Sequence, residues 1–204
     1  MYLYGASGHS KVVIDAIQSS VKDKVEFIFD DNPKSEFILN IPVKHIGVFE
    51  FKTLDEFIIS IGNNKIRKKI TEQINVNYIS VIHAKSIISE SSKIGKGTVV
   101  LAGAIVNADA QINNHCIINT GAVIEHDCII SDFVHISPNA SLAGNVFVGE
   151  GSHIGIGAVI IQGIKIGKWA TIGAGTVVIK DVPDYAVVVG NPGEIIKYKE
   201  EIEL

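Results

Sequence analysis

A histidine followed directly by an aspartate, His126-Asp127, is the pair in this sequence best suited to proton transfer. Imidazole titrates near neutral pH, and a carboxylate beside it can fix the tautomer of the ring and support it as a general base. The alternative is an ordinary solvated histidine on the protein surface. The choice between the two depends on what the fold places around the pair.

The pair lies within a stretch that has a six-residue period. An aliphatic residue occupies every sixth position from Ile82 to Val178 without a slip, and the residue four positions further on is usually small. Such a period fits neither a helix nor an alternating strand. It is typical of a hexapeptide β-helix, in which each repeat buries its apolar residue against the neighbouring repeats. We expect the aliphatic residues to point inward and the small residues to lie at the corners.

Positions eighteen apart should lie one above the other, about 5 Å apart, because three hexads close one triangular coil. This rule places Ala108 and Gly144 on either side of His126, so that small neighbours leave a groove beside the imidazole. Asp109 stacks on Asp127, and if both side chains face the same way the pKa of one carboxyl group is raised. These neighbours favour a functional role for His126.

The eighteen-residue rule also stacks His135 on His153. A histidine pair can bind a metal, so a zinc site with His126 as third ligand is an alternative. No further histidine or carboxylate completes an obvious ligand set, and we therefore favour a site without a metal. His83 and His115 have no evident partner and are expected at the surface.

The first residues predict a strand over 1–4, a glycine-rich turn over 5–9 and an amphipathic helix over 10–19. Backbone N–H groups at such a helix start suit an anion, most often a phosphate. The turn lacks the full G-x-G-x-x-G spacing, so it can equally be a tight turn that needs glycine for its geometry.

A second predicted strand, 25–29, ends at Asp30 and Asp31. A Rossmann-like half-fold places a ribose or base contact at this point, although a polar turn before Pro33 explains the acids as well. Taken together, the glycine turn and the two acids favour a nucleotide site in a small Rossmann-like α/β domain.

The remaining elements divide the chain into three regions. We expect a hairpin in 37–45, a strand in 57–61, a helix in 64–74 and a strand in 78–82. The basic residues of that helix are expected to form a solvated outer face (Lys65, Arg67, Lys68, Lys69). The predicted regions are an α/β domain (1–77), a β-helix (78–183) and a C-terminal tail (184–204). The tail should begin with a strand and turn, and we consider a helix for its charged end, 194–204.

Composition limits the class of protein. The 204 residues are 47% apolar and carry a formal charge of -4, so a substantial core is expected and a nucleic-acid partner is not. No signal peptide or long apolar run is evident, which predicts a cytoplasmic protein without a membrane partner. Cys116 and Cys128 are expected to be small buried residues in a reducing compartment.

Four motifs occur in one order: Gly-Ala-Ser-Gly-His, Asp-Asp, Ile-Gly-Asn-Asn-Lys-Ile-Arg and Val-Ile-Glu-His-Asp-Cys, the last within hexapeptide repeats. This layout resembles the nucleotide-amino-sugar acetyltransferases, and most closely the UDP-4-amino-sugar N-acetyltransferases of bacillosamine synthesis. The sialic acid O-acetyltransferases and GDP-perosamine N-acetyltransferases share it. The resemblance implies a left-handed β-helix, a homotrimer and acetyl-CoA as cosubstrate.

The resemblance also implies roles for individual residues. His126 is the expected general base and Asp127 the residue that orients it. The expected sugar-nucleotide contacts are Ser7, Gly8, His9, Asp30, Asp31 and Gly62. The expected acetyl-CoA contacts, between neighbouring subunits, are His135, Gly144, Ile156 and Ala174.

The expected reaction is direct acetylation of the 4-amino group of a UDP-linked 4-amino-4,6-dideoxy sugar, without an acyl-enzyme and without a metal. O-acetylation of a sialic acid or another sugar, and N-acetylation of GDP-perosamine, are alternatives, since Asp30-Asp31 can meet uracil or guanine. A zinc hydratase and a non-catalytic scaffold are alternatives of other classes. Substrate selection is expected to fall to the N-terminal domain, because no insertion interrupts the hexads.

Overall fold

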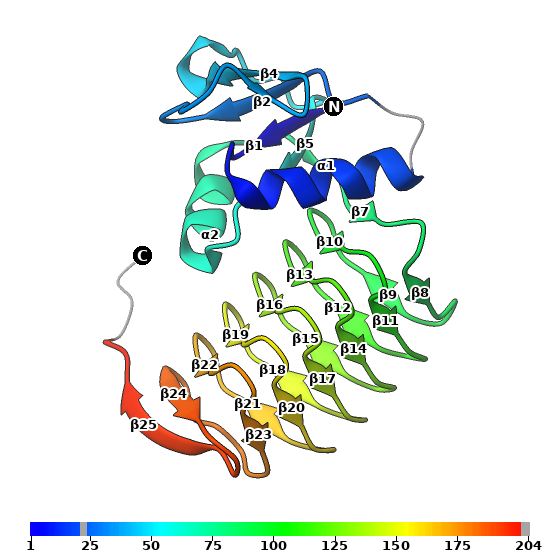
Figure 1. Ribbon diagram of the computed structural model, residues 1–204, viewed down its shortest axis with the longest axis vertical. Helices are drawn as coiled ribbons and strands as arrows, with labels where there is room; N and C mark the ends of the chain where they lie inside the picture. The colour runs from blue at the N-terminus through cyan, green and yellow to red at the C-terminus, as the bar shows by residue number, and fades with distance from the viewer. Residues whose placement is uncertain (21–23, 201–204) are drawn as a thin grey trace.

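An α/β unit sits on one end of a β-helix in the computed structural model, which describes residues 1–20 and 24–200 (Figure 1). The α/β sheet has the order β3-β4-β2-β1-β5-β6 and is parallel except for the β3–β4 hairpin. The predicted Rossmann-like unit and its hairpin are therefore confirmed. Its elements are β1 (Tyr2–Tyr4), α1 (Gly8–Ser20), β2 (Phe27–Asp30), β3 (Phe37–Ile38), β4 (Ile41–His45), the 3-10 helix η1 (Ile46–Val48), β5 (Glu56–Ile59), α2 (Asn64–Gln73) and β6 (Asn77–Tyr78).

Helix α1 packs between this sheet and the β-helix. Val13 and Ile17 of α1 are fully buried together with Leu3 and Ile58 of the central strands. The same cluster includes outward-facing residues of the first β-helix coils, Val81, Val99 and Leu101. One continuous apolar core thus joins the two parts of the chain.

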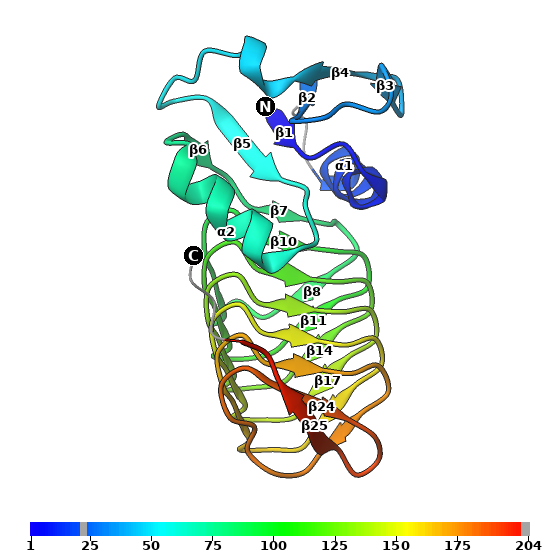
Figure 2. The same cartoon turned by 90° about the vertical axis from the view of Figure 1, so that its left-hand side faces the viewer.

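The β-helix is built from two-residue strands that form three parallel sheets, here called faces 1, 2 and 3 (Figure 2). Face 1 contains β7 (Val81–Ile82), β10 (Val99–Val100), β13 (Ile117–Ile118), β16 (His135–Ile136), β19 (His153–Ile154) and β22 (Thr171–Ile172). Face 2 contains β8 (Ile87–Ile88), β11 (Ile105–Val106), β14 (Val123–Ile124), β17 (Ser141–Leu142), β20 (Val159–Ile160) and β23 (Val177–Val178). Face 3 contains β9 (Lys93–Ile94), β12 (Gln111–Ile112), β15 (Ile129–Ile130), β18 (Phe147–Val148) and β21 (Lys165–Ile166).

The strand register confirms the eighteen-residue rule. Ile136 pairs with Ile154, and His135 pairs with His153, between β16 and β19. The isoleucines point inward and are fully buried, while the preceding residue of each strand points outward. Small residues such as Ala140 fill the corners, as the sequence predicts.

From Gly97 to Gly175, every sixth residue takes a left-handed backbone conformation, directly before the inward residue of each corner. Asp127 has φ 59° and Asn145 has φ 58°. Aspartate and asparagine tolerate this region better than most residues, whereas bulky side chains occupy it at a cost of about 1–2 kcal/mol. At the corner between faces 3 and 1, His115 and Phe133 nevertheless adopt it, and their rings stack at 5.3 Å.

The C-terminal tail corrects one expectation. β24 (Ala186–Val189) pairs in parallel with β22 and continues face 1, and β25 (Glu194–Tyr198) then pairs with β24 in the antiparallel direction. The helix considered for 194–204 is therefore wrong for 194–198, where backbone pairing to an open sheet edge is available. Residues 201–204 lie outside the described part of the chain.

Three polar side chains expected at the surface are buried. His83 and His115 are 7% and 8% exposed, because the α/β unit covers the first coils. Arg67 is 1% exposed and points from α2 into the junction with the β-helix, so it does not belong to a solvated basic face. Neither cysteine is bonded to another, and both are buried as predicted. None of the helices in residues 1–20 and 24–200 is long and apolar enough to cross a membrane.

Replacing an inward anchor should destabilise the whole β-helix. We expect Ile154→Ala to lower the free energy of unfolding by about 2–5 kcal/mol, because it leaves a cavity in a close-packed core. Ile87→Ala, at an outward position that is 64% exposed, is the matched control and should cost far less. Denaturant unfolding followed by circular dichroism measures both, and equal losses would contradict the inward assignment.

Candidate active site

His126 and Asp127 form a bonded pair at the corner between faces 2 and 3. They lie in the turn from β14 to β15, with Nδ1 of His126 2.7 Å from Oδ2 of Asp127. Both side chains are well exposed. The hydrogen bond to Asp127, with the nearby negative charges, raises the pKa of His126. Nε2 has no hydrogen-bond partner among the described residues, so it is free to accept a proton.

Gly144 provides the space beside this imidazole. A Cβ atom built on Gly144 would lie 2.6 Å from Cε1 and 2.7 Å from Nε2 of His126, well inside van der Waals contact. The predicted neighbour Gly144 therefore lies beside His126, but the ring itself occupies the space above the glycine, and any side chain at this position would displace the ring.

A cavity of about 440 Å³ spans face 1. It lies between the start of α2, the outer side of β19 and β22, and Lys199 after β25. It brings together three of the predicted positions, Gly62, Ile156 and Ala174. The other lining residues are Asn63, Asn64, Lys65, Gly151, His153, Gly155, Trp169, Thr171, Ile172, Gly173 and Lys199. The lining contains two lysines and no carboxylate.

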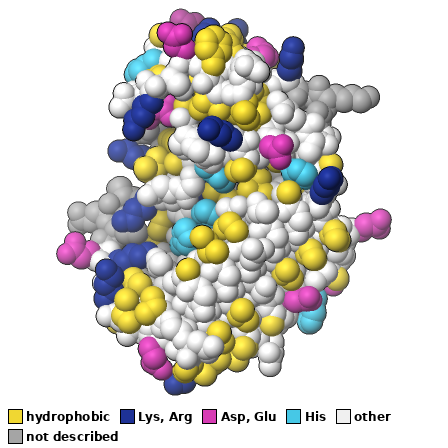
Figure 3. All heavy atoms as spheres, in the orientation of Figure 1, with side chains coloured by type: hydrophobic (Ala, Val, Ile, Leu, Met, Phe, Trp, Pro, Cys, Tyr) yellow, Lys and Arg dark blue, Asp and Glu magenta, His cyan; other side chains and the backbone are white. Residues whose placement is uncertain are grey.

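Three histidine rings gather at the edge of this cavity, where the α/β unit meets face 1 (Figure 3). The ring centroids of His135 and His153 are 4.7 Å apart, and those of His9 and His135 are 6.3 Å apart. Nδ1 of His135 lies 3.4 Å from the carbonyl oxygen of Gly62, and Nε2 lies 3.0 Å from Nδ2 of Asn119. Burial lowers the pKa of His135 to about 3 and that of His9 to about 4. These imidazoles are therefore neutral near pH 7.

The zinc alternative does not fit this arrangement. His135 and His153 are adjacent on face 1, whereas His126 lies at the corner between faces 2 and 3. Within residues 1–20 and 24–200, no group of three His, Cys, Asp or Glu side chains is placed to hold a metal ion.

The two acids at the end of β2 have different partners. Oδ2 of Asp30 accepts a hydrogen bond from the backbone N–H of Ala6 (2.7 Å), and Oδ1 accepts one from Asn32 N–H (2.8 Å). Asp31 accepts a hydrogen bond from the hydroxyl of Tyr4 (2.8 Å). Burial and this bond raise the pKa of Tyr4 well above its usual value. Asp30 is thus occupied by the backbone, while Asp31 remains exposed.

Ser7 and Gly8 line a separate cavity of about 360 Å³ between the glycine turn and the β3–β4 hairpin. Lys11, from the first turn of α1, also lines it. A helix start with a lysine beside it suits a phosphate. His9 faces the other side of α1, toward His135, so the structure separates it from Ser7 and Gly8.

Several residues of these cavities were not anticipated from the sequence. Lys11 and Phe37 line the smaller cavity, but nothing in their spacing along the sequence distinguishes them from ordinary surface residues. Lys199 and Trp169 lie thirty residues apart and meet only because β25 folds back on face 1. Asn64 belongs to the motif Ile-Gly-Asn-Asn-Lys-Ile-Arg, and its spacing of three residues from Arg67 places both on one side of a helix.

Two family models match the chain. The PglD N-terminal domain matches residues 1–74, and the bacterial transferase hexapeptide model (six repeats) matches residues 145–180. Perosamine N-acetyltransferase from Caulobacter crescentus, solved as a histidine variant with CoA and GDP-perosamine, is 34% identical. The similarity covers 96% of both chains with a TM-score of 0.91. The chain belongs to the hexapeptide-repeat sugar N-acetyltransferases.

Other members of this family are also similar. The acetyltransferase domain of PglB from Neisseria gonorrhoeae, solved with acetyl coenzyme A, is 34% identical over 96% of this chain and 98% of that one, with a TM-score of 0.86. UDP-N-acetylbacillosamine N-acetyltransferase from Bacillus subtilis is 42% identical over 107 residues, which cover 47% of this chain and 48% of that protein. The chain spans half or less of the length of the curated relatives it matches. The family and the left-handed β-helix inferred from the sequence motifs are confirmed.

For an N-acetyltransferase of this family, the His126-Asp127 pair generates a pH prediction. The Asp127 bond raises the pKa of His126, and the base form exists above that pKa, so kcat/KM should fall as pH drops through it. Asp127→Asn removes the stabilising charge, lowers the pKa of His126 and moves the acid limb to lower pH. The plateau rate should fall by at least about tenfold, since the ring is oriented less well.

Asp109→Asn is the matched control, because Asp109 occupies the same corner one coil earlier and has the same left-handed backbone. It should leave the acid limb in place. An unshifted limb in Asp127→Asn, measured as kcat/KM between pH 5 and 9, would rule out the pair as the titrating unit.

Proposed function

We propose that the protein transfers the acetyl group of acetyl-CoA to the 4-amino group of a UDP-linked 4-amino-4,6-dideoxy sugar. The observation that carries this proposal is the exposed His126-Asp127 pair, bonded at 2.7 Å, with an unbonded Nε2 on a ring that packs over Gly144. The similarity to UDP-N-acetylbacillosamine N-acetyltransferase supports the UDP sugar as substrate.

In the proposed reaction, His126 acts as general base at Nε2. Asp127 holds the proton on Nδ1, so that Nε2 carries the lone pair. The sugar amine attacks the thioester carbonyl carbon and forms the C–N bond as its proton passes to Nε2. The tetrahedral intermediate then collapses, the C–S bond breaks, and the imidazolium returns its proton to the sulfur of CoA. Atoms and charge balance without another reactant.

An acyl-enzyme is not part of this proposal. The Sγ atoms of Cys116 and Cys128 point inside the coils, where they bond to the carbonyl oxygens of Ser131 and Ala143. Burial raises the pKa of Cys116 to about 12, and that of Cys128 is also raised. Buried thiols with raised pKa values are poor nucleophiles.

The face 1 cavity is the proposed site of acetyl-CoA, and its lining supports this assignment. Three glycines and Ala174 line it along the coils, where a pantetheine arm can lie against the backbone. Lys65 and Lys199 supply positive charge for phosphates, and no lining carboxylate opposes them. We assign the predicted acetyl-CoA contacts Ile156 and Ala174 to this cavity, with His135 at its edge.

The nucleotide fits the cavity at the start of α1. Its phosphates would accept hydrogen bonds from the N–H groups near Ser7 and Gly8, with Lys11 as counter-charge. Phe37 and the rest of the hairpin offer an apolar surface for the base, and Asp31 remains available to the base or ribose. Asp30 acts through the turn that it closes, and not by direct contact.

Two copies of the chain are needed to complete the site. Ile156 and Ala174 lie at the corner between faces 1 and 2, whereas His126 and Gly144 lie at the corner between faces 2 and 3. One face of six residues separates these corners, which is about 20 Å at most. A neighbouring copy packed along the coils would bring its His126 to this subunit's cavity, as a homotrimer would do.

A GDP-linked amino sugar is the second candidate substrate, because the full-length similarity to perosamine N-acetyltransferase covers both domains. O-acetylation of a sialic acid is a third candidate from the shared motif layout. In both cases the base and the acyl donor are the same, so the substrate alone separates the candidates.

A panel of acceptors tests the proposal. With acetyl-CoA, we expect turnover of UDP-4-amino-4,6-dideoxy sugars, weaker turnover of GDP-perosamine and no turnover of free sialic acid. Release of the CoA thiol measures the turnover. His126→Ala should lower kcat by roughly 10²–10⁴-fold, the range of general-base catalysis, without loss of folding. Preferred turnover of GDP-perosamine or sialic acid would overturn the UDP assignment, and a near-normal His126→Ala rate would overturn the general base.

Mixing two inactive variants tests the shared site. His126→Ala lacks the base, and Ala174→Trp fills the face 1 cavity. Co-expressed one to one, they should recover about a quarter of wild-type activity, since one neighbour pair in four combines an intact base with an intact cavity. A site within single subunits predicts no recovery, because every chain in the mixture carries one defect.

A further inference from the structure

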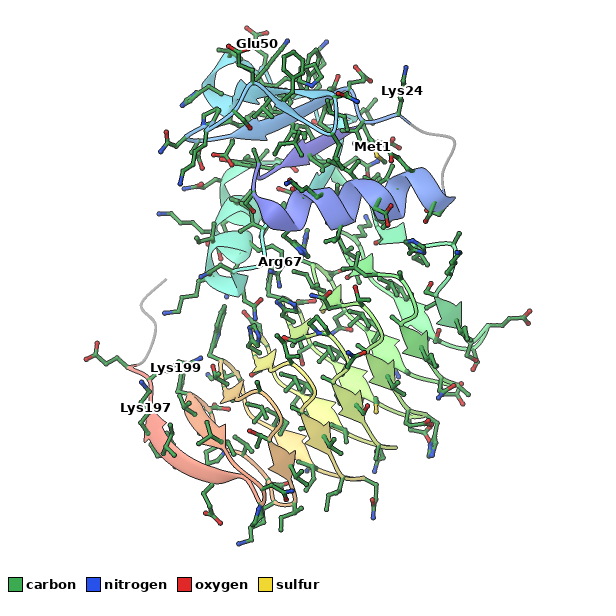
Figure 4. The ribbon with its side chains drawn as sticks, in the orientation of Figure 1. Met1, Lys24, Glu50, Arg67, Lys197 and Lys199 are labelled. Atoms are coloured by element: carbon green, nitrogen blue, oxygen red, sulfur yellow. The ribbon has the colours of Figure 1, made fainter. Side chains whose placement is uncertain are left out.

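Arg67 is a buried guanidinium at the centre of the junction between α2 and the β-helix (Figure 4). Its Nε donates a hydrogen bond to the carbonyl oxygen of His115 (2.7 Å), and Nη2 donates to that of Phe133 (2.9 Å). Nη2 also donates to Oδ1 of Asn64 (2.9 Å), and Nη1 to the carbonyl oxygen of Ile61 (2.9 Å). No carboxylate pairs with it within residues 1–20 and 24–200.

The carbonyls that Arg67 binds belong to a column at the corner between faces 3 and 1. Four left-handed residues, each eighteen after the last, have φ values from 54° to 66°. Their carbonyl oxygens accept no backbone hydrogen bond from the described residues, because the corner turns them away from the ladder between coils. The four residues are His115, Phe133, Gly151 and Trp169.

Side chains from outside the β-helix satisfy these four carbonyls. Arg67 binds the first two carbonyls, Nδ2 of Asn64 binds the third (3.0 Å), and Nζ of Lys199 binds the fourth (2.9 Å). Asn64 and Arg67 are three residues apart on α2, so both project from one side of the helix. The column therefore fixes α2 along the corner, coil by coil.

This docking determines one wall of the face 1 cavity. The bond from Nη1 of Arg67 to Ile61 holds the segment immediately before Gly62, whose carbonyl oxygen faces His135. Residues 62–65 line the cavity, and Lys199, which binds the last carbonyl of the column, lines it from another side. A shift of α2 along the corner would change the width of the cavity.

We propose that Arg67 is a positioning residue for acyl-donor binding. Its planar guanidinium group holds the Gly62–Lys65 segment, which forms one wall of the cavity, at a fixed distance from face 1. Arginine is needed because one planar group must reach two stacked carbonyls and the loop at once, which a lysine ammonium cannot do. The assignment of the cavity to the acyl donor rests on the proposed function, whereas the docking itself does not.

Arg67→Lys tests the proposal, because it keeps a positive charge at the site and removes the planar guanidinium group. Hydrogen exchange should show faster exchange for the amides of 61–66, with the coils still protected. The Kd for CoA, measured by calorimetry, should rise by about tenfold or more, as should the KM for acetyl-CoA, while kcat falls by less than about threefold. Lys69→Met, on the exposed side of the same helix, is the matched control and should match the wild type.

A merely structural role predicts a different pattern. It would lower the amount of active protein, and therefore apparent kcat, with unchanged Kd and KM, and that result would overturn the proposal. Arg67→Gln, which is uncharged and keeps two donors, provides a second variant if Arg67→Lys does not fold. CoA binding and hydrogen exchange are both measured without turnover. Absence of acetyl transfer in the wild type would therefore contradict the proposed function, and the test of the docking by Arg67 could still be interpreted.

Discussion

The stacking of coils of equal length is the constraint on which the rest of this structure depends. Each hexad buries one aliphatic side chain and closes a corner on a small residue, so its register is fixed by burial alone. Every outward position then has a defined face, corner and vertical neighbour. His126 meets Gly144 and His135 meets His153 for this reason, and no loop is needed to assemble either contact.

Regular stacking also leaves the carbonyl oxygens of corner residues without a backbone donor, and side chains of the α/β unit bind them. A left-handed corner residue turns its carbonyl out of the ladder between coils, which produces a straight column of acceptors along each edge. Where the α/β unit covers such an edge, Arg67 and Asn64 satisfy three of the carbonyls. A buried charge without a counter-ion is ordinarily unfavourable, and here several neutral carbonyls offset that cost together. The repeat thus dictates where the second domain can dock.

The β-helix and the neighbours of His126 could be predicted from the sequence. The features that could not be predicted all depend on tertiary contacts. The hexad period specified the coils, the inward residues and the neighbours of His126, because these depend on spacing alone. The burial of Arg67, His83 and His115 depends on how the α/β unit sits on the coils, which no local pattern encodes. Lys199 reaches the cavity only because β25 reverses onto face 1, which is a tertiary contact as well.

The histidines show why composition alone does not identify a base. His9 and His135 lie in a crowded junction beside a buried guanidinium, where burial lowers their pKa values to about 4 and about 3. Such rings are neutral but weakly basic, so they suit hydrogen bonding to an uncharged group. His126 is solvated and bonded to a carboxylate, which raises its pKa and makes it the stronger proton acceptor. An amine that attacks a thioester must lose a proton, and among these side chains only His126 combines basicity, a free Nε2 and open space.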